Sequence, residues 1–263
     1  DDLDRYHCTI EEREEYEPHI DMGTIVYAGV DYGVILERAE QEADVVIWDG
    51  GNNDIPFYKP DLHIVVTDPL RAGHELTYYP GAVNLMMADV LIIDKIDTAS
   101  LENIAILRDN IYRMAPDAIV VEAASPIRVE HAELIKGKKV IVIEDGPTLT
   151  HGGMPFGAGL VAAQRYRAAE IIDPRLFAIG SIRNVYQKFP LIGKVLPAMG
   201  YGKVQIKELE DTINSSDAEL VIIGTPIDLS RVMQINKEYV RVKYDLQEIG
   251  SPDLKEIILQ RLS

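Results

Sequence analysis

The chain has 263 residues, of which 47% are hydrophobic and 26% charged, and its formal net charge is −17. This is the composition of a globular protein, and it excludes a collagen-like, an intrinsically disordered and a membrane-spanning chain. The negative charge predicts no binding to nucleic acid or to an anionic membrane, so an anionic ligand requires a locally positive pocket.

Short runs of β-branched residues alternate with amphipathic segments in the first part of the chain. The runs are mostly Val and Ile, as in parallel strands buried on both faces, and they lie at 24–27, 44–48, 62–67, 90–93, 118–121 and 139–143. Helical periodicity predicts helices at 32–43 and 98–114. The alternation indicates an α/β fold with a doubly wound, mostly parallel sheet over residues 1–145.

A Gly-rich loop, Gly146–Gly159, opens a second, smaller α/β part at residues 146–263. Strands are expected there at 170–172, 220–223 and 239–244, and helices at 157–168, 181–189, 203–214 and 252–262. The acidic run Glu11–Glu15 is expected to be a solvated surface. The single cysteine, Cys8, excludes an intrachain disulfide and fits a cytoplasmic protein.

An acidic loop follows the run 44–48, beginning at Asp49 and ending at Asp54, with Gly50 and Gly51 between them. In P-loop NTPases an Asp at the carboxyl end of such a strand binds Mg²⁺, and glycines let a phosphate approach. The same residues are also typical of a polar turn. Both interpretations stay open at this point.

The segment Asp94-Lys95-Ile96-Asp97 follows the run 90–93 and is similar to the base-recognition motif of G proteins, with Asp94 in place of the usual Asn. In those proteins the last Asp binds the guanine edge and the Lys stem lies along the base. Ala124 follows the next strand, where a second base-contacting loop is expected. The alternative is an Asp-Lys pair that caps the helix at 98–114.

Two further loops carry polar groups to the ends of strands. Arg71 and His74 follow the run 62–67 and could clamp a phosphate or move a proton, or could be ordinary surface residues. The Gly-rich loop predicts an anion-binding nest of backbone N–H groups that opens onto a helix, or else a tight crossover. Its candidate ligands are Thr148, Thr150, His151, Gly152 and Gly153.

Five stretches of the chain together resemble the archaeal-type cyclic 2,3-diphosphoglycerate synthetase family. They are residues 9–20, 48–54, 57–63, 145–153 and 224–229, and Pro197–Tyr201 fits as well. The resemblance covers essentially the whole chain. Members of the family are longer and carry their P-loop in an N-terminal portion that would precede Asp1. We therefore expect a C-terminal part of such a protein, with residues 1–145 as the remainder of a P-loop NTPase-like core.

The resemblance implies an ATP-dependent synthetase that closes an intramolecular phosphoanhydride in 2,3-diphosphoglycerate. By that analogy Asp49 binds Mg²⁺, with Asn52 and Asp54 nearby. The nucleotide base lies against Asp94, Lys95, Asp97 and Ala124. Gly50, Gly51 and the loop from Thr148 to Gly153 bind phosphate, and Arg71, His74 and His151 help to hold the polyanionic substrate. The expected catalytic residues are Asp49, Arg71, His74 and His151.

No G-x-x-x-x-G-K-[ST] sequence occurs in the chain. We therefore expect the 263 residues alone to be inactive and to need an upstream P-loop portion as partner. Two alternatives remain. The first is a P-loop GTPase or kinase with another substrate, since the Lys-x-Asp motif leans toward GTP. The second is a non-catalytic binding or oligomerisation module, which leaves a homo-oligomer open.

Overall fold

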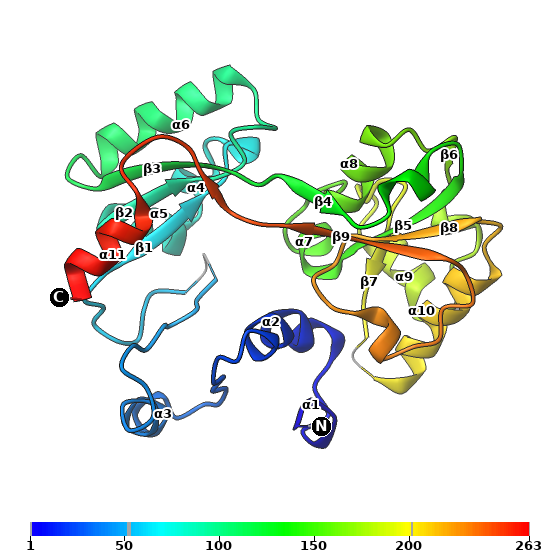
Figure 1. Cartoon of the computed structure of the whole chain (residues 1–263), viewed down its shortest axis with the longest axis horizontal. Coiled ribbons are helices and arrows are strands. Elements are labelled where there is room, and N and C mark those ends of the chain that lie inside the picture. The colour runs from blue at the N-terminus through cyan, green and yellow to red at the C-terminus, as the bar shows by residue number, and fades with distance from the viewer. Residues whose placement is uncertain (1, 52–53, 201, 263) are drawn as a thin grey trace. The chain divides into compact units, whose positions relative to one another are not determined.

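The computed structural model describes residues 2–51, 54–200 and 202–262. The chain divides into two compact units, coloured along the chain in Figure 1. Unit 1 comprises residues 1–26 and 127–244, and unit 2 comprises residues 27–126 and 245–263. The expected boundary at residue 146 falls inside unit 1. The α/β fold class is confirmed, because each unit contains a largely parallel sheet with helices.

Unit 2 contains a four-stranded sheet in the order β1-β2-β3-β10. Strands β1 (Ile64–Thr67), β2 (Val90–Ile93) and β3 (Ile119–Ala124) are parallel, and β10 (Gln247–Glu248) is antiparallel to β3. The four residues of β2 are at most 4% exposed, which explains their continuous apolar sequence. Polar residues that follow β1, β2 and β3 consequently share one edge of the sheet.

The helices of unit 2 are α3 (Tyr32–Ala39), α4 (His74–Thr77), α5 (Tyr79–Met87), α6 (Leu101–Met114) and α11 (Leu254–Leu262). Helix α6 begins where Ser100 accepts a hydrogen bond from the backbone N–H of Asn103, a typical N-cap. Leu107 and Ile111 of α6 pack with Leu91 and Ile93 of β2. The predicted helix at 98–114 is thus confirmed, and it begins three residues later than expected.

The predicted strands at 24–27 and 44–48 are wrong. Neither segment has regular secondary structure. The side chains of Ile25, Val45 and Ile47 are 56%, 49% and 83% exposed. A buried parallel strand needs a neighbour on each side, and the described part of the chain supplies no strand that pairs with these runs.

Unit 1 contains a six-stranded sheet with the path β4-β9-β8-β5-β6, and β7 also pairs with β5. Its parallel centre is formed by β5 (Lys139–Asp145) and β8 (Leu220–Ile223), which is followed outward by β9 (Tyr239–Tyr244). On the other side of β5 lie β6 (Glu170–Ile171) and β7 (Leu196–Ala198). The edge strand β4 (Ile127–Val129) is antiparallel to β9.

The helices of unit 1 are α1 (Asp2–Arg5), α2 (Ile10–Asp21), α7 (Gly146–Thr150), α8 (Ala158–Arg165), α9 (Gly180–Lys188) and α10 (Lys203–Ser215). Ile182 of α9 and Leu209 and Ile213 of α10 are fully buried in the core formed with β5 and β8. The N-terminal segment is joined to this core by Ile10, which is 1% exposed. Helix α2 therefore belongs to unit 1, although more than 100 residues separate it from the rest of the unit.

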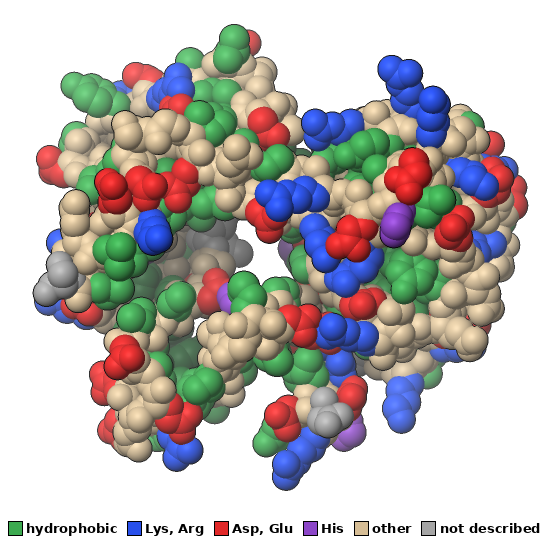
Figure 2. Space-filling model, in the orientation of Figure 1, with side chains coloured by type: hydrophobic (Ala, Val, Ile, Leu, Met, Phe, Trp, Pro, Cys, Tyr) green, Lys and Arg blue, Asp and Glu red, His purple; other side chains and the backbone are tan. Residues whose placement is uncertain are grey.

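The expectation that Glu11–Glu15 forms a solvated surface is wrong for part of the run. Arg13 and Glu14 are 8% and 9% exposed, and Glu17, one turn later, is 5% exposed. On the face of the molecule seen in Figure 2, acidic and basic side chains are interspersed. None of the described helices is long and apolar enough to cross a membrane.

Candidate functional site

The carboxyl ends of β5 and β8 meet at the place where the strand order of unit 1 reverses. The chain leaves β5 toward β6 and β7 on one side, and β8 lies on the other side. Ligands of open α/β sheets bind outside the carboxyl ends of strands at such a reversal. Glu144 and Asp145 end β5, Thr225 follows β8, and Glu14 reaches them from α2. We call these four residues the acid centre.

Glu144 is 1% exposed and is bound by the beginning of α8. Its Oε1 atom accepts hydrogen bonds from the N–H groups of Gly157 at 3.1 Å and Leu160 at 2.7 Å, and its Oε2 atom accepts one from Gly159 at 3.1 Å. Burial raises the pKa of Glu144 to about 7, although these three bonds favour the charged form and lower it. The N–H groups where the Gly-rich loop enters α8 are therefore bonded to a carboxylate of the chain itself, and they lie outside the candidate ligands at 148–153.

Glu14 is hydrogen-bonded to Asp145. Burial raises the pKa of Glu14 to about 10, and the hydrogen bond to Asp145 and the charge of Asp145 add to this effect. Thr225 is 1% exposed, and its hydroxyl donates a hydrogen bond to Glu14 Oε1. At a pKa of about 10, Glu14 is mostly neutral at pH 7, and as an acid it can donate to Asp145.

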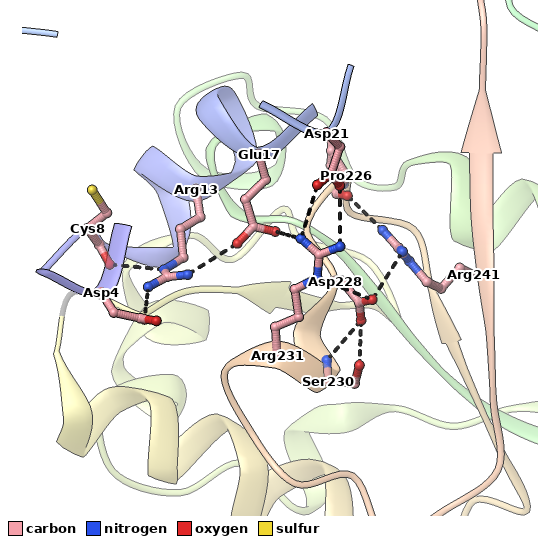
Figure 3. Close-up of polar contacts among 10 residues, drawn as sticks. All are labelled: Asp4, Cys8, Arg13, Glu17, Asp21, Pro226, Asp228, Ser230, Arg231 and Arg241. Carbon is pink, nitrogen blue, oxygen red and sulfur yellow. Dashed lines mark hydrogen bonds and ion pairs between the residues drawn. The ribbon is translucent and has the colours of Figure 1, made fainter. Parts of the chain in front are cut away.

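A network of ion pairs joins α2 to the loop after β8 (Figure 3). Arg13 pairs with Glu17 at 3.2 Å and with Asp4. Arg231 reaches Glu17 at 3.5 Å and Asp21 at 3.3 Å. Because Arg13 and Glu17 are nearly buried, this network holds α2, and with it Glu14, over the end of β8.

Asp228 extends the same network into the sheet. It accepts hydrogen bonds from the backbone N–H and hydroxyl of Ser230, and it pairs with Arg241 of β9 at 3.4 Å. Arg241 also donates to the carbonyl of Pro226 at 2.9 Å. Thr225, Pro226 and Asp228 of the stretch 224–229 therefore make structural contacts at or near the acid centre.

The predicted residues of the Gly-rich loop lie beside the acid centre. The hydroxyl and backbone N–H of Thr148 donate to Asp145, which thereby caps α7. The Thr150 hydroxyl donates to the carbonyl of Gly146 at 2.8 Å, within α7. His151 is exposed, with its ring 6.0 Å from that of Phe189, and Gly152 and Gly153 follow it.

In unit 2 the predicted cations meet at the edge formed by β1 and β2. Lys95 Nζ lies 3.0 Å from Asp68 Oδ2, and an Arg71 nitrogen lies 3.4 Å from the same oxygen. Asp68 also caps the short helix Pro69–Arg71 through the N–H of Leu70. Sequence reasoning missed Asp68, which holds the two cations together. His74 stands apart from this group at the start of α4, beside the ring of Tyr78.

The predicted base-binding loop is tied to the end of β3 by Ser125. The Ser125 hydroxyl contacts both carboxylate oxygens of Asp94, at 2.9 and 2.8 Å, and its N–H donates to Asp97 at 3.2 Å. Ala124, the last residue of β3, is 6% exposed. Lys95 has a φ of 57°, in the left-handed region. Asp94 and Asp97 are thus joined through Ser125, and the binding of a base by this segment stays a prediction.

The predicted metal ligands lie in the segment that lacks regular structure. Asp49, Gly50, Gly51 and Asp54 are exposed, and the carbonyl of Asp54 accepts a hydrogen bond from Asn84 at 2.8 Å. Asn52 lies outside the described residues. Among the residues that the structure describes, no three His, Cys, Asp or Glu side chains gather as metal ligands.

The predicted site residues are therefore divided between the two units. Asp49, Arg71, Asp94 and Lys95 belong to unit 2, whereas the Gly-rich loop belongs to unit 1. Sequence reasoning missed Glu14, Glu144 and Thr225. Two signals could have indicated the two acids: Thr9 and Glu12 form a capping box that starts a helix, and Glu144 directly follows the buried apolar run Val140–Ile143 of β5.

No family model matches the chain. Over 258 residues, 98% of this chain, it is 64% identical to a protein of Thermococcus kodakarensis named arginine synthetase ArcE. Over 227 residues, 86% of this chain, it is 31% identical to a protein of Thermococcus sibiricus named cyclic 2,3-diphosphoglycerate synthetase. The chain is related to synthetases.

The matched regions are 58% of the first relative and 46% of the second, so the chain spans about half the length of these relatives. The resemblance to cyclic 2,3-diphosphoglycerate synthetases is supported by one of the two matches. The more similar of these two relatives carries a different name.

Proposed function

We propose that the chain is part of a nucleotide-dependent synthetase that forms arginine. The observation that carries this proposal is the 64% identity, over 98% of the chain, to a protein named arginine synthetase. Formation of cyclic 2,3-diphosphoglycerate is the second candidate. It is supported by the 31% identity to a protein of that name and by the five stretches that resemble the family.

In this proposal the edge of unit 2 that carries Lys95 and Asp97 binds the nucleotide. The Lys95 ammonium is held beside Asp68, at a position from which its stem can lie along a base. Loops at the carboxyl ends of parallel strands are the usual binding positions in such sheets. ATP is the expected nucleotide, with GTP as the alternative that the Lys-x-Asp motif suggests.

Asp49 and Asp54 are the proposed carboxylates for Mg²⁺. Magnesium usually keeps several waters and binds one or two carboxylates together with substrate phosphates, so two acids suit it without a third protein ligand. Bound there, the ion would offset phosphate charge. The residues that we assign to phosphate are Gly50, Gly51 and, in unit 1, the loop from Thr148 to Gly153.

We further propose that a P-loop portion upstream completes the nucleotide site. The exposed β-branched runs at 24–27 and 44–48, which lack strand partners among the described residues, support this. We also propose a cytoplasmic location, since the single cysteine excludes an intrachain disulfide, and a homo-oligomer stays open. A P-loop GTPase or kinase and a non-catalytic module remain the other functions to test.

The test is an assay of the natural full-length protein with Mg-ATP or Mg-GTP. One reaction supplies citrulline, the ureido analogue of arginine, with ammonium, and arginine is measured by amino-acid chromatography. A parallel reaction supplies 2,3-diphosphoglycerate, and the cyclic phosphoanhydride is sought by phosphorus NMR. Nucleotide-dependent arginine formation is expected. The cyclic product alone would favour the second candidate, and nucleotide hydrolysis without either product would reject both.

A further inference from the structure

Two adjacent residues at the end of β5 hold the two ends of the Gly-rich loop. Asp145 accepts hydrogen bonds from Thr148 at the start of α7, and Glu144 accepts three from residues 157–160 at the start of α8. Residues 151–156, which connect the two helices, are thereby attached at both ends to the central strand of unit 1.

We propose that Glu144 is the positioning residue of the Gly-rich loop, and that its carboxylate sets the course of residues 151–156. Contact of these residues with the substrate rests on the proposed function. Their positioning rests only on the hydrogen bonds of Glu144 and Asp145. Glu144 acts through the backbone of the loop and touches no reacting group.

The backbone lies very close to the Glu144 carboxylate at three glycines. A Cβ atom added to Gly224 would lie 2.4 Å from Glu144 Oε2, and one added to Gly157 would lie 2.6 Å from the same oxygen. At Gly159 an added Cβ would lie 2.8 Å from Val142 Cγ1 and 3.2 Å from Glu144 Oε1. Three glycines from two separate segments therefore let the backbone approach the Glu144 carboxylate closely.

The charge of Glu144 makes the loop sensitive to pH. Asp145 is the charged neighbour that raises its pKa further, and Glu14 on α2 lies beyond Asp145. The facing residues of α8, from Gly157 to Leu160, and the end of β8, Gly224 and Thr225, carry no charged side chain. A buried Glu144 binds its proton more tightly than a solvated one, so opening of the loop becomes easier as pH rises through about 7.

Hydrogen–deuterium exchange of peptides covering residues 151–160 tests this proposal. It is measured between pH 5.5 and 8.5 and corrected for the intrinsic rate of amide exchange. In the native chain the opening constant is expected to rise by roughly 30-fold over this range and to level off above the pKa of Glu144. In Glu144→Gln this dependence should disappear, and protection at pH 5.5 should fall about 10-fold, because an amide nitrogen accepts no hydrogen bond.

Gly224→Ala is a second and independent variant, because it displaces the carboxylate without changing its charge. It should also reduce protection of residues 151–160. Glu208→Gln is the matched control: Glu208 likewise binds the start of a helix, through the N–H of Ser181 at 2.8 Å, but lies on α10. It should leave exchange at residues 151–160 unchanged.

The proposal is overturned if Glu144→Gln keeps the protection and pH dependence of the native chain, or if Glu208→Gln changes this peptide as much. Because exchange is measured without substrate, the proposed function does not enter this result. In the full-length enzyme, Glu144→Gln should then raise KM for the amino-acid or phosphorylated substrate more than it lowers kcat. An unchanged KM together with the expected exchange would leave the positioning role standing and reject the placement of substrate at this loop.

Discussion

The hydroxyl of Thr225 donates a hydrogen bond to the carboxyl of Glu14, although 211 residues separate the two along the chain. Both residues are buried, and Glu14 is also hydrogen-bonded to Asp145. Three stretches that the sequence shows as separate motifs, at 9–20, 145–153 and 224–229, therefore meet at one edge of the sheet of unit 1.

Replacing Glu14 by Gln should preserve the acid centre. The amide can accept from Thr225 through its oxygen and donate to Asp145 through its nitrogen, which is the pattern of the protonated acid. Because burial raises the pKa of Glu14 from 4.5 to about 10, its stabilising contribution is complete below pH 4.5 and is lost as pH rises toward 10. Glu14→Gln should therefore equal the native chain near pH 5 and exceed its stability by roughly 1–3 kcal/mol at pH 8.

Urea denaturation between pH 5 and 9 measures this difference. Glu15→Gln is the control, because Glu15 is the exposed neighbour on the same helix. It should change the free energy of unfolding by less than about 0.5 kcal/mol at every pH. A Glu14→Gln chain that is destabilised at pH 8 would show that Glu14 is ionised in the folded protein.

The same substitution one turn later should have the opposite effect. Glu17 is 5% exposed and pairs with Arg13 and Arg231. Glu17→Gln removes the charge that compensates two guanidinium groups, and Arg13 is itself nearly buried. We expect a loss of about 2 kcal/mol in the free energy of unfolding at pH 7. A loss equal to that of Glu15→Gln would mean that the network in Figure 3 does not hold α2.

The central strands could be predicted because a strand that is buried on both faces has a continuous apolar sequence. The runs at 90–93 and 220–223 coincide with β2 and β8, and their residues are at most 4% exposed. The run at 44–48 has the same β-branched texture but forms no strand. A local pattern reports that a segment suits a sheet, and it does not report whether a neighbouring strand is present.

The acid centre could be predicted only in part, because charge pairing is not periodic. The loop at 146–159 was identified from its glycines, and Glu144 and Asp145 adjoin it. The charged run of helix α2, five of its first six residues, predicts a solvated surface from its local sequence. The buried carboxylate of Glu17 is compensated by Arg231, which is more than 200 residues away. A local sequence pattern does not indicate such a distant partner.

Gly146→Ala should destabilise unit 1 strongly. A Cβ atom at Gly146 would lie 2.3 Å from the carbonyl oxygen of Ala198, a backbone atom of β7 that cannot rotate away. We expect a loss of about 1–3 kcal/mol, as is typical of overpacking. Gly202→Ala is the matched control, because nothing lies within 4 Å of its added Cβ. Thermal unfolding of the two variants measures the contrast, and equal midpoints would contradict the close approach of β7 to the start of α7.

Lys95→Ala should weaken nucleotide binding by the full-length protein if the edge of unit 2 is the nucleotide site. The Lys95 ammonium is held 3.0 Å from Asp68, and the loop that carries it is fixed by the contacts of Ser125 with Asp94 and Asp97. Removing one charge-assisted contact typically costs about 1.5–3 kcal/mol, which corresponds to a rise in Kd of roughly 10- to 100-fold.

Titration with a fluorescent analogue of ATP or GTP measures this Kd. Arg108→Ala provides the control, because Arg108 is another cation of unit 2 whose partner, Glu122, lies on β3. It should leave the Kd within about 2-fold of the native value, since a surface ion pair contributes little. Equal effects of the two variants would indicate general electrostatic attraction. If Lys95→Ala leaves the Kd unchanged, the nucleotide does not bind at this edge. A base that lies along the Lys95 side chain would bind more weakly once that side chain is removed.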